Sequence, residues 1–105
     1  MDLGLLYRAL KDRRVSMVAG NTTDGVLSKL DVRVLKDDKH AFPPYQACIV
    51  VRAAALAQNP ELRQALSELS GKITDDQMRR MNYAVDGEHR QVHEVAKEFL
   101  QQVQK

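Results

Sequence analysis

The key segment of this chain is Gly20-Asn21-Thr22-Thr23-Asp24-Gly25. Glycine at either end suits a tight turn, and asparagine, threonine and aspartate are residue types that begin helices. The apolar residues Val26, Leu27 and Leu30 follow at helical spacing. We therefore expect a turn at residues 20–25 that leads into a short helix.

The elements around this turn follow from the spacing of apolar residues. One face of a helix expected over residues 3–12 carries Leu3, Leu6, Tyr7 and Leu10. Residues 15–19 and 31–35 are short and partly β-branched, which is typical of strands. The first part of the chain is thus predicted to run from helix to strand, through the turn and a short helix, to a second strand.

A polar connection at residues 36–44 leads into a proline pair. Because proline restricts its own backbone and that of the residue before it, Phe42-Pro43-Pro44-Tyr45 is expected to be extended and to present an aromatic ring. Residues 45–52 are apolar enough for a third, central strand. Within that strand, Cys48 is expected to be a buried thiol.

The remainder of the chain predicts helices. Residues 53–58 form a short one, and Asn59 and Pro60 start another as N-cap and first helical residue. Gly71 suits a helix stop, and residues 74–77 form a capping box for the next helix. A last helix over residues 91–103 is expected to face inward with Val92, Val95, Ala96, Phe99 and Val103. The fold class that follows is α/β, with about three strands, flanking helices and a helical C-terminal region.

Composition limits the classes of function. The chain has 105 residues, 44% of them apolar, which fits one small domain. Its 16 basic and 14 acidic residues are interspersed and give a net charge of +2, so nucleic-acid binding is not expected. No apolar run is long enough to span a membrane, no export signal opens the chain, and a single cysteine permits no internal disulfide.

Motifs of catalysis and metal binding are incomplete. The segment from His93 to Lys97 resembles the start of a zinc-protease helix, but lysine stands where the second ligand histidine is required. His40 and His89 have no Cys or His at ligand spacing, and no serine lies in a nucleophile elbow. We therefore expect neither an enzyme nor a bound metal or cofactor.

Four segments together resemble a known family. They are residues 3–12, the turn at 20–25, the segment 37–45 with its Phe-Pro-Pro-Tyr end, and the segment 71–78, Gly-Lys-Ile-Thr-Asp-Asp-Gln-Met. From about Asp2 to about Leu100, the chain resembles the C-terminal part of the substrate-binding proteins of ABC importers for glycine betaine, choline and related osmoprotectants. The resemblance implies part of a periplasmic-binding-protein fold, a two-lobed clamp that closes on its ligand.

The same resemblance implies how the chain is divided. Residues 1–35 would end the second lobe, residues 36–44 would connect the lobes, and residues 45–105 would return to complete the first lobe. In isolation, these parts are expected to form one compact unit. Because most of each lobe would be missing, uncovered sheet edges favour a homo-oligomer such as a homodimer, with segments exchanged across residues 36–44.

A ligand site is implied where the family's chain approaches its cleft. A quaternary ammonium group donates no hydrogen bond and is recognised by aromatic faces, a role that suits Tyr45. Asn21, Thr22, Thr23 and Asp24 would fix polar atoms of the ligand. For two residues a structural interpretation stays open: Tyr45 as a tyrosine packed on the prolines, and Asp24 as an ordinary helix cap.

Position 21 departs from the pattern of betaine-selective members of the family, several of which have tyrosine there. Asn21 replaces an aromatic face by an amide that both donates and accepts hydrogen bonds. This favours a ligand with a polar group at that point, such as choline or a betaine-like amino acid, over glycine betaine.

Two interpretations of function follow. The first is a substrate-binding module, or a fragment of one, that takes a quaternary ammonium compound, docks on an ABC permease and works outside the cytoplasmic membrane, as the resemblance implies. The second is a truncated, self-associating α/β protein that binds no ligand.

Overall fold

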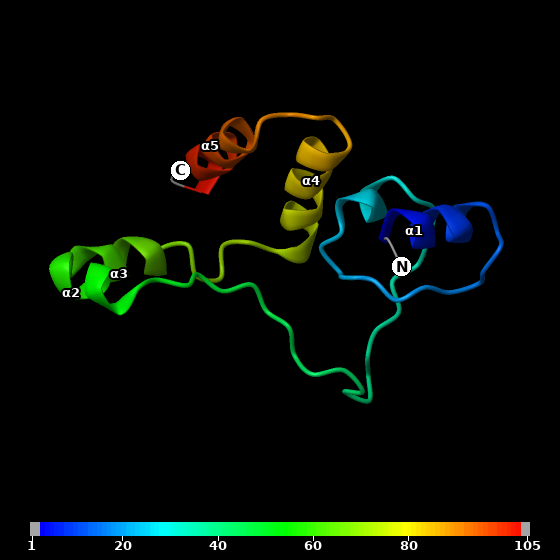
Figure 1. Ribbon diagram of the computed structural model, residues 1–105, viewed down its shortest axis with the longest axis horizontal. Helices are drawn as coiled ribbons and strands as arrows, with labels where there is room; N and C mark the ends of the chain where they lie inside the picture. The colour runs from blue at the N-terminus through cyan, green and yellow to red at the C-terminus, as the bar shows by residue number, and fades with distance from the viewer. Residues whose placement is uncertain (1–2, 104–105) are drawn as a thin grey trace. The chain divides into compact units, whose positions relative to one another are not determined.

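Helices provide the regular structure of this protein (Figure 1). The computed structural model describes residues 3–103, so the ends of the predicted ranges, residues 1–2 and 104–105, lie outside it. Its elements, in chain order, are α1 (Leu3–Lys11), the 3-10 turn η1 (Gly25–Ser28), α2 (Ala53–Gln58), α3 (Glu61–Ser67), α4 (Asp75–Asp86) and α5 (Val92–Val103).

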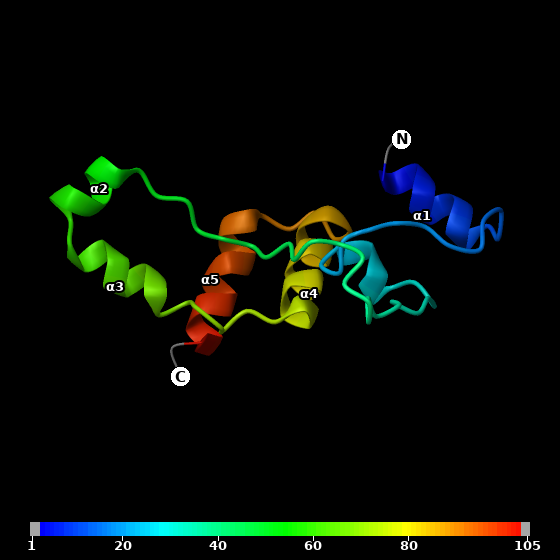
Figure 2. The same cartoon turned by 90° about the horizontal axis from the view of Figure 1, so that it is seen from below.

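The predicted α/β fold class with about three strands is wrong, because no residue from 3 to 103 belongs to a strand. Residues 15–19, 31–35 and 45–52, the three expected strands, have irregular backbone (Figure 2). A strand exists through ladder hydrogen bonds to a neighbour, and β-branched composition describes fit to a pleated surface rather than a backbone preference. None of the three segments has such a neighbour among the described residues.

The predicted helices are confirmed, with small shifts at their ends. α1 stops one residue before position 12, α2 covers residues 53–58, and α5 starts one residue after position 91. α3 begins at Glu61 with Pro60 as its cap residue, so Asn59 is not the N-cap that we expected. Gly71 adopts the left-handed φ of 72° that suits a helix stop, but it lies beyond the C-cap residue of α3, which is Glu68.

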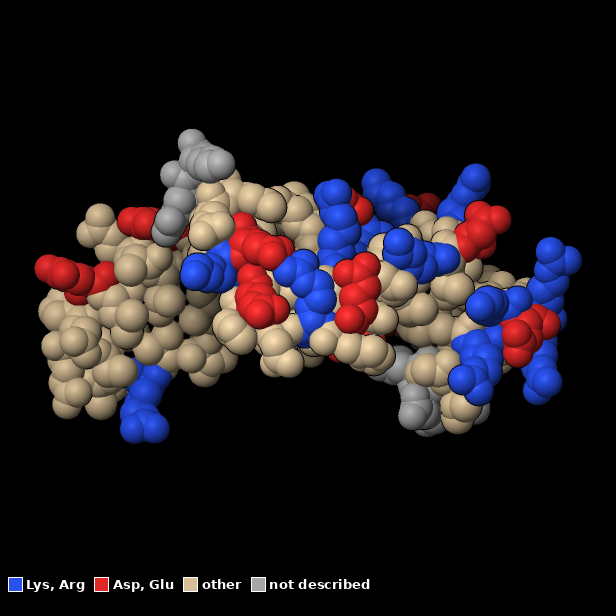
Figure 3. Space-filling view, turned by 90° about the horizontal axis from the view of Figure 1, so that it is seen from above, with Lys and Arg blue, Asp and Glu red and all other residues tan. Residues whose placement is uncertain are grey.

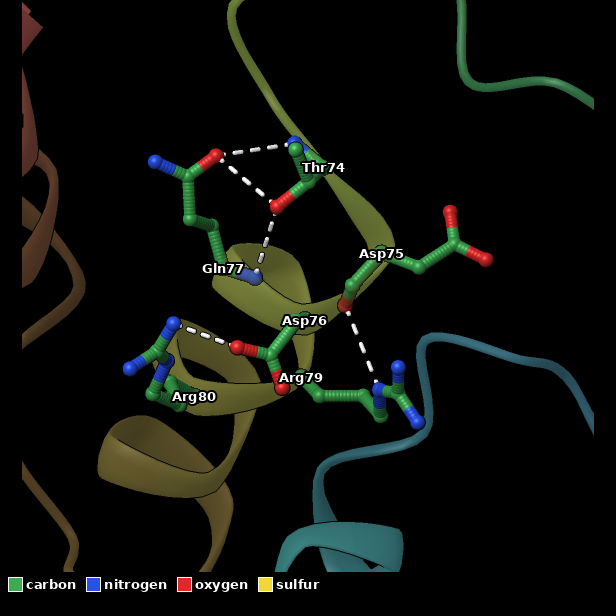
Figure 4. Close-up of polar contacts among 6 residues, drawn as sticks. All are labelled: Thr74, Asp75, Asp76, Gln77, Arg79 and Arg80. Atoms are coloured by element: carbon green, nitrogen blue, oxygen red, sulfur yellow. Dashed lines mark hydrogen bonds and ion pairs between the residues drawn. The ribbon is translucent and has the colours of Figure 1, made fainter. Parts of the chain in front are cut away.

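The N-terminus of α4 has the predicted capping box (Figure 4). The Thr74 hydroxyl accepts a hydrogen bond from the Gln77 backbone N–H at 3.2 Å, and the Gln77 side-chain carbonyl accepts one from the Thr74 N–H at 2.9 Å. Arg80 pairs with Asp76 one turn earlier on the same helix. The start of α4 is therefore set by local sequence.

The described residues divide into two units. One contains residues 3–33 and 74–103, and the other contains residues 34–73. In the first unit α4 lies against η1 and α5, and in the second α2 lies against α3. The predicted assignment of residues 1–35, 36–44 and 45–105 to two lobes and their connection concerns a larger protein and stays a prediction.

The core of the first unit is small. Its buried apolar side chains are Tyr7, Val95 and Phe99. Of the residues expected to face inward on α5, Val95 and Phe99 do so, whereas Val92 is 66% exposed and Ala96 is exposed as well. Because α5 lies mainly against α4, only a narrow stripe of its surface is covered.

The second unit leaves a long apolar segment uncovered. Every residue from 41 to 50 is exposed, including the large side chains of Phe42, Ile49 and Val50. Cys48 lies in this segment and is exposed, so the prediction of a buried thiol is wrong. The cause is the missing strand pairing, since no neighbouring layer of the described residues covers these side chains.

Acidic and basic side chains lie next to one another on the face shown in Figure 3. Arg90 and Glu98 form an ion pair at 2.5 Å; their hydrogen bond lowers the pKa of Glu98 and raises that of Arg90. Pairs as open to solvent as this one contribute little to stability. Among residues 3–103, no helix combines the length and the apolar character needed to cross a bilayer.

Candidate functional site

The predicted site residues 21–24 form a closed turn in the first unit. The Asp24 N–H donates to the Asn21 carbonyl at 3.1 Å. The Asp24 carboxylate in turn accepts from the Asn21 backbone N–H at 3.0 Å through Oδ2, and from the Asn21 side-chain amide at 3.4 Å through Oδ1. Hydrogen bonds in both directions therefore fix the distance between the two ends of the turn.

A further contact to Asp24 comes from helix α1. The Tyr7 hydroxyl donates to Asp24 Oδ2 at 2.5 Å, and the Tyr7 side chain is 7% exposed. Burial, followed by the hydrogen bond and the negative charge of Asp24, raises the pKa of Tyr7 to about 12. The hydroxyl consequently stays protonated, and able to donate, throughout the neutral pH range.

Helix α4 holds the turn at a second point. The Asn82 side-chain amide donates to the Thr23 carbonyl at 2.8 Å. Gly25 is buried directly after the turn, and a Cβ at this position would lie 2.5 Å from the Tyr83 backbone nitrogen and 2.8 Å from the Asn82 carbonyl carbon. Only glycine permits such a close approach of η1 to the backbone of α4.

The four residues of the turn differ in exposure. Asn21 and Thr22 are exposed, whereas Thr23 and Asp24 are half-buried. Asp24 stands at the N-cap position of η1, but its side chain makes no hydrogen bond to the helix amides. Asp24 is thus not an ordinary helix cap, because its carboxylate serves Tyr7 and Asn21 instead.

Tyr45 lies in the second unit, after a segment that Asp37 organises. The Asp37 carboxylate accepts hydrogen bonds from the Ala41 and Phe42 backbone N–H groups, both at 2.9 Å, and these bonds hold the pKa of Asp37 below its usual value. The Tyr45 side chain is 94% exposed. It is therefore not packed on the prolines, and both faces of its ring are open to a ligand.

The structure thus gathers four of the five predicted site residues into one turn. Tyr45 belongs to the other unit, so its membership of the same site stays a prediction. Tyr7 and Asn82 were not among the predicted site residues, although both donate hydrogen bonds to the turn. For Tyr7 a signal was present, since a phenol on the apolar face of a helix needs a hydrogen-bond partner once it is buried.

An open depression on the first unit is a weaker candidate. Its lining residues are Ser28, Lys29, Asp76, Arg80, Tyr83 and Glu88. Lys29 Nζ lies 5.1 Å from the centroid of the Tyr83 ring, so a side chain of the protein already occupies the ring face that a cationic ligand would need. No group of His, Cys, Asp or Glu side chains within residues 3–103 is arranged to hold a metal ion.

Comparison with known families shows to which family the chain belongs. The model of the substrate-binding domain of ABC-type glycine betaine transport systems matches residues 1–102. The chain belongs to this family. The glycine betaine substrate-binding domains are transport proteins rather than enzymes, and the family resemblance that the four sequence segments suggested is confirmed.

Three relatives show how the chain fits into the glycine betaine family. The carnitine transport binding protein of Listeria monocytogenes is 40% identical over 101 residues, and the glycine-betaine-binding protein of Pseudomonas aeruginosa is 40% identical over 102. The ergothioneine transport permease/ergothioneine binding protein of Helicobacter pylori is 38% identical over 103 residues. These alignments cover 96%, 97% and 98% of this chain, but only 33%, 33% and 19% of the respective relatives. The chain therefore spans a third or less of the length of these relatives.

A solved structure of the family agrees with the observed fold. A crystal structure described as that of a glycine betaine/carnitine/choline ABC transporter is 42% identical and has a TM-score of 0.88. The match covers 97% of this chain and 37% of that chain. The fold of this chain is thus similar to that of a part of this larger solved chain.

Proposed function

We propose that this chain is part of the substrate-binding protein of an ABC importer and helps to bind a quaternary ammonium osmoprotectant such as choline or glycine betaine. The match of residues 1–102 to the glycine betaine family carries the proposal. The ligand class is supported by relatives named for carnitine and for glycine betaine, each 40% identical to the chain.

The chemistry of the predicted site residues suits this ligand class. A methylated ammonium group cannot donate hydrogen bonds, so it is held by aromatic faces, each contributing about 0.5 to 2 kcal/mol. Tyr45 supplies an exposed ring for the cationic group. Asn21, Thr22 and Thr23 supply polar groups for the rest of the ligand, in a turn that Asp24 closes.

Asn21 is the residue that we expect to influence the choice of ligand. Its side chain is exposed, and its amide can exchange hydrogen bonds with a ligand hydroxyl. We therefore propose that choline binds more tightly than glycine betaine.

The partner and location follow from the same proposal. A substrate-binding protein delivers its ligand to a permease, so the chain acts beside an ABC permease on the outer side of the cytoplasmic membrane. The fusion of permease and binding protein in the name of the Helicobacter pylori relative supports this assignment.

Isothermal titration of the protein in its natural full length tests the proposal, with choline, glycine betaine and carnitine as ligands. We expect saturable binding, and an affinity about 2- to 30-fold lower in Tyr45→Ala, because the cation–π contribution is lost. Tyr45→Phe is the matched control, since it keeps the ring and should bind within a few-fold of the unmodified protein. Equal affinities of Tyr45→Ala and the unmodified protein would remove Tyr45 from the site.

Self-association without ligand binding is the second candidate, and one observation favours it. The exposed segment 41–50 carries large apolar side chains, and apolar patches of this kind recruit other chains. A homodimer with segments exchanged across residues 36–44 would cover them. Light scattering during the titration distinguishes the candidates: a well-folded dimer that gives no heat with any of the three ligands supports self-association, and a ligand-binding monomer rules it out.

A further inference from the structure

We propose that Tyr7 is a positioning residue for the ligand: it acts through Asp24 to hold the turn of residues 21–24 in its binding conformation, and Asp24 itself does not contact the ligand. This inference rests on the proposed function. It extends that function by assigning a role to a residue on a different helix.

The acceptor capacity of Asp24 is the first argument. A carboxylate has about four lone-pair sites, and three of those of Asp24 already accept from protein donors. Tyr7 and the Asn21 backbone N–H share Oδ2, and the Asn21 side chain reaches Oδ1. The half-buried carboxylate is therefore directed toward groups of the protein.

The position of the contact is the second argument. The Tyr7 hydroxyl bonds the same oxygen that accepts the Asn21 N–H, so one atom links α1 to the first residue of the turn. The Tyr7 hydroxyl lies close to the backbone just before the turn, since a Cβ on Gly20 would be 2.1 Å from the hydroxyl oxygen. Removal of that hydroxyl would free Oδ2 to rotate and would loosen its hold on Asn21.

The third argument concerns the polar groups of the turn that other described residues leave without a hydrogen bond. Asn82 occupies the Thr23 carbonyl, and Asp24 is engaged by Tyr7 and Asn21. The Asn21 side-chain carbonyl and the Thr22 hydroxyl are exposed and have no hydrogen-bond partner within residues 3–103. An acceptor and a hydroxyl that are held in a fixed relation suit a ligand hydroxyl such as that of choline.

The test compares variants of the full-length protein by titration with choline, at a temperature where circular dichroism shows each variant folded. We expect Tyr7→Phe and Asp24→Ala each to weaken binding by about tenfold, since each removes the hydrogen bond between the Tyr7 hydroxyl and the charged Asp24 carboxylate. Because both changes break the same link, the double variant should bind about as well as the weaker single variant. Tyr83→Phe is the matched control, since the Tyr83 hydroxyl has no hydrogen-bond partner in the described residues, and it should bind within twofold of the unmodified protein.

Each other outcome would count against the proposal. A Tyr7→Phe protein that melts at a lower temperature but binds choline within twofold of the unmodified protein shows a role in stability alone, and leaves the proposed function intact. Losses that multiply in the double variant show that Tyr7 does not act through Asp24. If the unmodified protein binds none of choline, glycine betaine and carnitine, the proposed function fails and the positioning role fails with it.

Discussion

At Gly25 the backbone of η1 meets the backbone of α4 with no side chain between them. The space that a methyl group would need is occupied by the Tyr83 nitrogen and the Asn82 carbonyl carbon, which are main-chain atoms. Main-chain atoms of a helix cannot move aside as the end of a flexible side chain can. The glycine therefore fixes how closely the segment after the turn of residues 21–24 can approach α4.

We predict that Gly25→Ala lowers the free energy of unfolding by about 1 to 3 kcal/mol, the usual cost of forcing extra atoms into packed structure. Gly71→Ala is an informative control, because a Cβ there would meet no atom within 4 Å and only the φ of 72° opposes it. Its cost should be about 1 kcal/mol, from the left-handed conformation alone. Urea unfolding measures both, and a Gly25→Ala protein as stable as the unmodified one would contradict the close approach described.

At the scale of single residues, the turn could be predicted from the sequence, but its hydrogen-bond partners on α1 and α4 could not. Glycine, asparagine and aspartate mark a turn by their local backbone preferences, and the structure has one at residues 21–24. Tyr7 and its partner Asp24 are 17 positions apart in the sequence, and Asn82 and its partner Thr23 are 59 positions apart. Such pairs depend on the path of the whole chain, which local preferences do not specify.

At the scale of the elements, the conformation of residues 37–42 depends on a single carboxylate, that of Asp37. Asp37 accepts from two successive backbone amides, those of Ala41 and Phe42. It thereby bends the chain just before the two prolines, where His40 takes a positive φ of 52°. The direction in which Tyr45 leaves this segment depends on the bend.

We predict that acid releases this bend. The two amide hydrogen bonds, that of Phe42 first, lower the pKa of Asp37 from the model-compound value of 3.8. The stabilisation is therefore complete above pH 3.8 and is lost as the pH falls through the lowered pKa of the folded segment. The amide NMR shifts of Ala41 and Phe42 should titrate together with a midpoint below 3.8. Asp37→Ala should abolish this titration and Asp38→Ala should preserve it; a titration that persists in Asp37→Ala would refute the assignment.

The elements also show which part of the fold the sequence could predict. The helices were found because their signals are local, as in the capping box between Thr74 and Gln77. The strands expected at residues 15–19, 31–35 and 45–52 were wrong because a strand needs a partner, and the described residues provide none. The predicted burial of Cys48 was wrong for the same reason, since it was inferred from the expected strand at residues 45–52.

On the scale of the whole molecule, much apolar surface remains uncovered. The first unit buries Tyr7, Val95 and Phe99, and the second exposes the entire segment 41–50. The chain also covers only about a third of its carnitine and glycine-betaine relatives. A ligand that binds only the folded state should therefore add measurably to the free energy of unfolding.

We predict that choline stabilises the full-length protein against heat and urea. Binding to the folded state alone adds about 2.7 kcal/mol to the free energy of unfolding when the free ligand is at 100 times its Kd. Glycine is the control compound, because its ammonium group carries no methyl groups and is poorly matched to an aromatic face. Equal stabilisation by choline and glycine would contradict recognition of the quaternary ammonium group.

The bond between Thr23 and Asn82 sets an order for events during synthesis. Tyr7 leaves the ribosome before Asp24 does, so the α1 partner of the turn is present as soon as the turn is made. Asn82 follows Thr23 by 59 positions, a delay of about 3 to 12 s at the usual rate of translation. The bond from Tyr7 to the turn can thus form while the chain is still being synthesised, whereas the bond from Asn82 has to wait for α4.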